Sequence, residues 1–183
     1  LKKEFEGTVL LVFQPAEEKL PGGAKLMLDE GALNMPKPEL ILGQHVMPGL
    51  EVGKVGFRPG MYMASADEIY LTIKGKGGHA AMPHQLVDTV LITSHIIVAL
   101  QQIVSRNAYA ATPSVLSFGK VEALGATNII PQEVKVAGTF RTMDEEWRKD
   151  AHGKIKKIAE TVAESMGAEC EVNIMVGYPC VIN

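Results

Sequence analysis

Two adjacent carboxylates are the sharpest chemical feature of the sequence. Glu17 and Glu18 follow the apolar run Val9–Phe13, which is continuous rather than alternating. Neighbouring side chains point in different directions, so one carboxylate can bind a metal ion while the other faces a metal-held water as a general base. An isolated pair of acids is more often part of a solvated loop, so the pair alone does not define a site.

A histidine follows the second apolar run in the same way. His45 comes shortly after Leu40–Leu42. Because the carboxyl ends of buried strands meet at one edge of an open α/β sheet, we expect His45 to lie near Glu17 and Glu18. A carboxylate and an imidazole are common ligands of divalent metals, but a catalytic zinc normally takes three protein ligands.

The glycine-rich segment Gly75–His84 holds a second candidate histidine. It lacks the Gly-Lys-Ser/Thr ending of a phosphate loop, which disfavours nucleotide binding. Its glycines permit close approach of a ligand, and His79 could donate a hydrogen bond to a developing oxyanion. A loop that simply exposes its histidines is the plain alternative.

Arg141 is the candidate for binding an anionic group. It follows the alternating segment Val134–Phe140, on the face away from the predicted helices or near the rim of the sheet. A guanidinium suits a carboxylate through two parallel hydrogen bonds, although a single strand arginine usually only aids solubility. Asn128 lies in the preceding loop, and His95 and His152 fall within predicted helices, where we expect them to be bystanders.

The elements that position these residues differ between the two parts of the chain. The first part is dense in glycine and proline, and residues 1–5 have the character of a helix end. Its apolar runs predict buried strands, and a short helix is closed by Gly31. The predicted strands are Val9–Phe13, Leu40–Leu42 and Val52–Phe57, and the predicted helix is Gly23–Glu30.

From Asp67 onward, the hydrophobic period predicts the order β-α-β-β-α-β. We expect a helix capped by Asp88 and a second helix opened by a capping box at Thr142 and Glu145. This order makes a four-stranded antiparallel sheet with both helices on one face, the ferredoxin-like plan. The predicted strands are Ile69–Ile73, Val115–Phe118, Val134–Phe140 and Cys170–Val176, and the helices are 89–106 and 143–166.

Composition narrows the functional classes. The chain has 183 residues, and 18 basic residues against 21 acidic ones give a net charge of −3. This balance disfavours a nucleic-acid partner, and we find no apolar run that approaches the roughly 18 residues of a membrane span. Cys170 and Cys180 are too few for a disulfide framework, so we expect a cytoplasmic protein without a membrane partner.

Five segments occur here in an order typical of one family. They resemble the dinuclear-metal amidohydrolases of the aminoacylase and carboxypeptidase type, especially hippurate hydrolases and indole-acetyl-amino-acid hydrolases. The resemblance covers essentially the whole chain, and each motif is weak alone. The segments are Val12–Glu18, Gly43–Val46, Gly75–His84, Asn128–Pro131 and Gly138–Thr142.

The resemblance implies an α/β fold of two parts. Residues 1–63 would be a partial zinc-peptidase-like catalytic domain, and residues 64–180 a ferredoxin-like lid, or dimerisation, domain. It also implies hydrolysis of the amide bond of N-acyl amino acids or small peptide-like substrates. Two divalent metal ions (Zn, Mn or Co) and a homodimer formed through the lid would belong to the full-length enzyme.

The resemblance further implies a role for each candidate residue. Glu17 would be the general base, and Glu18 and His45 would be metal ligands. His79 would polarise the scissile carbonyl in its own or a partner subunit's site. Asn128 and Arg141 would hold the substrate, with Arg141 on its carboxylate.

The family's upstream Cys-Gly-His segment and its late C-terminal histidine do not occur in this sequence. We therefore expect an internal fragment with an incomplete metal site that is inactive alone. A non-catalytic ferredoxin-like dimerisation or ligand-binding module is the alternative function. RNA recognition is disfavoured, because the central strands offer only Phe118 and Phe140 as aromatic residues.

Overall fold

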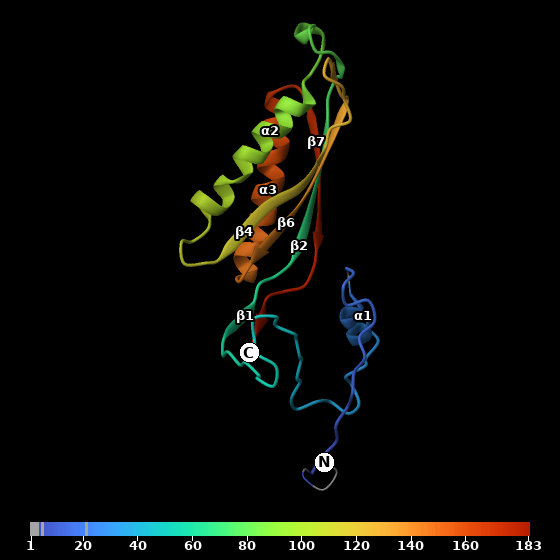
Figure 1. Cartoon of the computed structure of the whole chain (residues 1–183), viewed down its shortest axis with the longest axis vertical. Coiled ribbons are helices and arrows are strands. Elements are labelled where there is room, and N and C mark those ends of the chain that lie inside the picture. Colours follow the sequence, from blue (N-terminus) through green and yellow to red (C-terminus); the bar gives the residue numbers. More distant parts are fainter. Residues whose placement is uncertain (1–3, 5, 21) are drawn as a thin grey trace. The chain divides into compact units, whose positions relative to one another are not determined.

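The computed structural model describes residue 4, residues 6–20 and residues 22–183 (Figure 1). The chain divides into two compact units, one up to Lys54 and one from Val55 to Asn183. The helix end predicted at residues 1–5 falls mostly on positions outside the described residues. The domain boundary predicted after residue 63 lies inside the second unit and stays a prediction.

The first unit contains one helix within its described residues, α1 (Gly23–Asp29). Gly31, at φ +83°, follows its C-terminus in the left-handed conformation, as predicted. At the other end, a Cβ on Gly23 would lie 2.0 Å from the carbonyl oxygen of Pro15. The helix therefore begins directly against the turn that carries the two glutamates.

The strands predicted in this unit are wrong for the described structure. The segments Val9–Phe13, Leu40–Leu42 and Val52–Phe57 form no strand, and Phe13 and Leu42 are 82% and 84% exposed. A strand buried on both faces needs neighbouring strands and covering helices. The described part of this unit supplies only a seven-residue helix, so the apolar runs have nothing to pair with.

The second unit confirms the ferredoxin-like plan. Four antiparallel strands lie in the order β4-β6-β2-β7, and the two long helices cover one face of the sheet (Figure 1). The strands are β2 (Asp67–Lys74), β4 (Ser114–Glu122), β6 (Glu133–Thr142) and β7 (Glu169–Val176), and the helices are α2 (Thr89–Leu100) and α3 (Glu145–Ser165).

The core of this unit lies between the sheet and the helices. Alternate residues of β2 and β6 face the helices and are buried, as the period of two requires. The buried apolar side chains are Ile69, Leu71, Ile73, Ile92, Ile96, Leu100, Ile103, Leu116, Val134, Val136, Phe140, Ala151, Ile155, Ala159, Ala163 and Ala168.

The structure confirms the predicted cap of α2 and corrects the predicted cap of α3. Asp88 accepts hydrogen bonds from the amides of Val90 and Leu91, as expected for the cap of α2. The cap of α3 is Asp144, which accepts from Glu146 and Trp147 at 2.9 Å each. Thr142 is instead the last residue of β6, where it pairs with Ser114 of β4, and its hydroxyl donates to the carbonyl of Pro113 rather than accepting from a helix amide.

The helix α2 continues into a π-helical turn, η2 (Ile103–Asn107). Together they span 19 residues with a mean hydropathy of 1.2, which is long and apolar enough to cross a membrane. A core helix passes the same test of length and composition. Ile92, Ile96 and Leu100 of α2 belong to the core of this unit, so the feature is weak evidence for a membrane span.

Two small ladders and a short 3-10 helix complete the second unit. β1 (Met61–Met63) pairs with β8 (Val181–Ile182) beside the beginning of β2. β3 (Gly78–His79) pairs with β5 (Ile129–Ile130) beyond the other end of β2, and η1 (Pro83–Gln85) follows β3.

A buried charge cluster joins α3 to the sheet where the chain enters and leaves it. Asp67, at the start of β2, accepts hydrogen bonds from Arg148 Nε at 2.9 Å, His152 Nε2 at 2.7 Å and the amide of Gly177 at 3.0 Å. Glu145 accepts from Arg148 and from the amide of Cys180. His152, expected to be a bystander, is therefore part of this cluster.

The cluster keeps its charges despite burial. Burial opposes ionisation of Asp67, but the hydrogen bonds from Arg148, His152 and Gly177 outweigh it and hold the pKa of this carboxyl well below its usual range. The hydrogen bond that Arg148 donates to Asp67 has the opposite effect on the cation and raises the pKa of Arg148. The pair is ionised at neutral pH, and it fixes the segment that follows β7.

Candidate functional site

The Glu17-Glu18 turn has a strained backbone. Ala16 has φ +50°, and no other non-glycine residue among those described has a positive φ. The Lys19 amide donates to the Ala16 carbonyl at 3.2 Å and closes the turn, which leaves both glutamates exposed. Left-handed backbone at a residue with a Cβ costs about 1–3 kcal/mol and is typical of functional sites, so it supports a role for this turn.

His45 is held in the tautomer that suits a metal ligand. Its Nδ1 lies 2.7 Å from the carbonyl oxygen of Val46. A carbonyl only accepts, so Nδ1 donates, and in the neutral ring Nε2 carries the lone pair. A backbone carbonyl on the far nitrogen is the usual way in which a metal-binding imidazole is oriented.

A complete metal site does not form within the described residues. No group of three His, Cys, Asp or Glu side chains in that part of the chain could hold a metal ion. Glu18 and His45 have the right chemistry for a divalent metal, because carboxylate and imidazole suit Zn, Mn and Co. They can supply only part of the ligand set.

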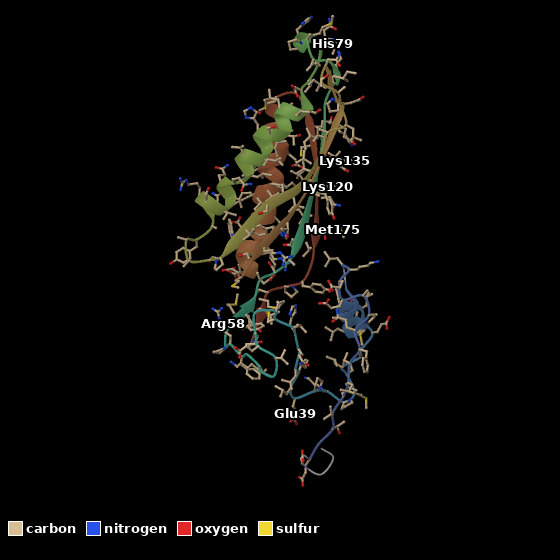
Figure 2. The ribbon with its side chains drawn as sticks, in the orientation of Figure 1. Glu39, Arg58, His79, Lys120, Lys135 and Met175 are labelled. Atoms are coloured by element: carbon tan, nitrogen blue, oxygen red, sulfur yellow. The ribbon has the colours of Figure 1, made fainter. Side chains whose placement is uncertain are left out.

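The structure brings His79 and Asn128 together. His79 in β3 pairs with Ile129 in β5, and the amide of Ala80 donates to the carbonyl of Asn128 at 2.9 Å. A Cβ on Gly77 would lie 2.6 Å from the carbonyl oxygen of Ile130, so this close approach requires glycine. Figure 2 shows His79 at the far end of the second unit from Arg58.

His79 has the opposite tautomer from His45. The amide of Ala81 donates to His79 Nδ1 at 3.1 Å, so Nδ1 is the acceptor. In the neutral ring the proton is therefore on Nε2, and the side chain is exposed. An imidazole N–H fixed in this way can donate a hydrogen bond to a carbonyl oxygen that becomes negative during a reaction.

Arg141 lies at the other end of the sheet. It is exposed on β6, opposite Val115 of β4. His79 lies beyond the opposite end of the sheet, where Lys74 of β2 pairs with Glu133 of β6. Glu133 is eight residues along β6 from Arg141. This separation is roughly 25 Å at the ordinary rise of a strand. A molecule the size of a dipeptide, about 7 Å long, cannot contact both residues of one chain.

The candidate residues are divided between the two units. Glu17, Glu18 and His45 are in the first unit, and His79, Asn128 and Arg141 are in the second. The sequence reasoning missed Asp67 and Arg148, which lie 81 residues apart. No spacing rule links such distant positions. The one available signal is the alternation of buried and exposed residues along β2, which puts the acid Asp67 at a position facing the core.

The sequence matches known proteins over its whole length. Residues 65–167 match the M20 peptidase dimerisation domain. The chain is 39% identical over 183 residues to an N-acyl-L-amino acid amidohydrolase of Geobacillus stearothermophilus, with all of this chain and 49% of that protein covered. It is 38% identical over 182 residues to an N-acetylcysteine deacetylase of Bacillus subtilis, with 100% of this chain and 47% of that protein covered. The chain spans about half the length of the curated relatives it matches.

The chain also resembles solved crystal structures, among them the following two. One is a protein of methicillin resistant Staphylococcus aureus, with a TM-score of 0.85 and 32% identity over 93% of this chain and 45% of that one. The other is the Bacillus subtilis YXEP protein, described as a dinuclear metal binding peptidase from the M20 family. Its TM-score is 0.69, with 33% identity over 93% of this chain and 41% of that one.

Proposed function

Since this chain belongs to the M20 peptidase family, we propose that it is part of a dinuclear-metal enzyme that hydrolyses the amide bond of N-acyl amino acids. The observation that carries the proposal is the 39% identity, over the entire chain, to an N-acyl-L-amino acid amidohydrolase. The tautomers of His45 and His79 support it. His45 Nε2 has the lone pair that a metal ligand needs, and His79 Nε2 has the proton that an oxyanion donor needs.

In the proposed mechanism, each residue acts at a defined atom. Glu18 and His45 Nε2 would hold metal, which when bound lowers the pKa of water and polarises a carbonyl. Glu17 takes a proton from the attacking water and passes it to the leaving amine. His79 Nε2–H donates to the carbonyl oxygen as negative charge develops there, and Arg141 binds the carboxylate of the substrate.

The proposed active site uses two copies of the chain. His79 and Arg141 of one chain are too far apart for one small substrate, so we assign them to different subunits at each site. The match to a dimerisation domain supports a homodimer. So does the outer face of α2, where Val90, Leu91 and Val98 are 39%, 50% and 73% exposed.

We also propose a cytoplasmic location. Cys170 and Cys180 are both free thiols, which fits a reducing compartment. Burial is the main cause of the raised pKa of Cys170, about 11, so this thiol is poorly reactive at neutral pH.

The test uses the full-length enzyme that contains this sequence. Release of amino acid from hippurate and from N-acetyl amino acids is measured after metal removal by a chelator and after addition of Zn²⁺, Mn²⁺ or Co²⁺. We expect activity to disappear with the metal and to return with at least one of the three ions. An enzyme that hydrolyses none of these substrates with any of the ions would refute the proposed function.

A further inference from the structure

We propose that Ile129 contacts the acyl group of the substrate and makes the enzyme favour bulky apolar acyl groups over acetyl. This inference rests on the proposed function and adds a residue that selects the substrate. It starts from the small ladder between β3 and β5, which places one aliphatic side chain beside His79.

The register of the ladder fixes this neighbour. His79 pairs with Ile129, and the next pair, Ala80 with Asn128, is hydrogen bonded from the Ala80 amide to the Asn128 carbonyl. Hydrogen-bonded and non-hydrogen-bonded pairs alternate in an antiparallel ladder, so His79 and Ile129 form a non-hydrogen-bonded pair. In such pairs the two side chains lie on the same face and at their closest approach, with Cβ atoms about 4.5–5.5 Å apart.

The backbone of Ile129 is held rigidly while its side chain stays accessible. Its amide donates to the carbonyl of Ala126 at 3.1 Å, and its own carbonyl accepts from the amide of Ala126 at 3.0 Å. A Cβ on Gly125 would lie 2.4 Å from the Ile129 carbonyl oxygen, so the hairpin is tight there too. The side chain of Ile129 is nevertheless 51% exposed, which leaves apolar surface beside His79.

The chemistry of the substrate assigns this surface to the acyl group. A carbonyl oxygen bound to His79 Nε2 at about 2.9 Å lies on the face of the ladder that the Ile129 side chain shares, so one substituent of the carbonyl carbon can reach this side chain. The amino-acid side carries a carboxylate, which belongs with a cation such as Arg141. The acyl group has no charge and gains from contact with a branched aliphatic side chain.

The experiment compares two substrates that differ only in the acyl group. N-benzoylglycine and N-acetylglycine are hydrolysed by the full-length metal-loaded enzyme and by its Ile129→Ala and Ile129→Val variants. We expect Ile129→Ala to lower the ratio of kcat/KM for benzoyl over acetyl about tenfold, the lower end for lost contact in an apolar pocket. Ile129→Val should keep most of the ratio. Leu124→Ala is the matched control, because Leu124 is 91% exposed in the loop between β4 and β5 and is not paired with His79.

The outcomes separate this inference from the proposed function. If the unmodified enzyme hydrolyses neither substrate, both the function and the inference fail. If it hydrolyses either substrate but Ile129→Ala slows both reactions equally, or leaves the ratio within twofold, only the inference is overturned. An equal loss would mean that Ile129 merely shapes the hairpin.

Discussion

The two candidate histidines differ in which ring nitrogen the backbone engages. The carbonyl of Val46 accepts from His45, whereas the amide of Ala81 donates to His79. The first contact leaves a lone pair on Nε2, and the second leaves a proton there. A single residue type is thereby prepared for a ligand role in one unit and a donor role in the other.

Replacing His79 with alanine in the full-length enzyme should lower kcat by about 10²–10³, because one oxyanion donor is lost. The metal content should not change, since the variant alters no proposed ligand. Steady-state kinetics and elemental analysis check both statements. His84→Ala is the matched control, an exposed histidine of the same loop that should leave kcat unchanged. Equal effects of the two substitutions would contradict the role of His79.

Replacing Glu17 with glutamine should abolish turnover while metal remains bound, because the amide cannot accept the proton of the water. Replacing the adjacent Glu18 with glutamine should instead lower the metal content, because a ligand charge is lost. Elemental analysis of both variants, with hippurate hydrolysis as the activity assay, separates the roles. Full activity of Glu17→Gln would refute its role as base.

At the scale of elements, the sequence predicted the second unit well and the first poorly. The alternation of Ile69, Leu71 and Ile73 is a local signal, because one face of β2 is buried by helices of the same unit. The runs at Val9–Phe13 and Leu40–Leu42 are equally apolar, yet a doubly buried strand depends on neighbours that the described residues do not supply. Hydrophobic periodicity therefore predicts those strands and helices that pack against other elements of the same unit.

The cap of α3 gives a direct test of the corrected helix start. Asp144→Ala should destabilise the chain by about 1 kcal/mol, since two first-turn amides lose their acceptor. Urea denaturation of this chain measures the change. Asp150→Ala is the control, because its ion pair with Lys154 is exposed and worth little. A loss no larger than that of the control would mean that Asp144 is not the cap.

The buried charge cluster predicts the response to acid. Asp67→Asn should cost about 3–5 kcal/mol at neutral pH, because Arg148 loses its buried counter-charge and keeps only the partly exposed Glu145. The pKa of Asp67 is lower in the folded state than in the unfolded state, so its stabilisation is complete above about pH 4 and is lost as the pH falls.

Urea denaturation between pH 7 and pH 2 checks this sign. The free energy of unfolding of Asp67→Asn should fall less steeply below about pH 4 than that of the unmodified chain. Lys74→Gln, which removes the exposed pair with Glu171, is the control and should leave the profile nearly unchanged. Parallel profiles for the Asp67 variant and the unmodified chain would contradict the charged state of the cluster.

At the scale of the whole molecule, each proposed site needs residues from two chains. The sequence alone left open whether His79 serves its own or a partner subunit's site. The register of β2 with β6 supports the partner subunit's site, because it places Arg141 at one end of the sheet and the ladder of His79 beyond the other end. Motif order along the chain carries no such distance, so this part of the site could not be predicted from the sequence.

Mixing two inactive variants of the full-length enzyme tests this arrangement most directly. His79→Ala and Arg141→Ala are refolded or expressed together in equal amounts, and hippurate hydrolysis is compared with that of each variant alone. A hybrid dimer contains one site with both residues intact, so the mixture should regain about a quarter of the unmodified activity. If the mixture is no more active than the separate variants, His79 and Arg141 do not act across the dimer and the account is wrong.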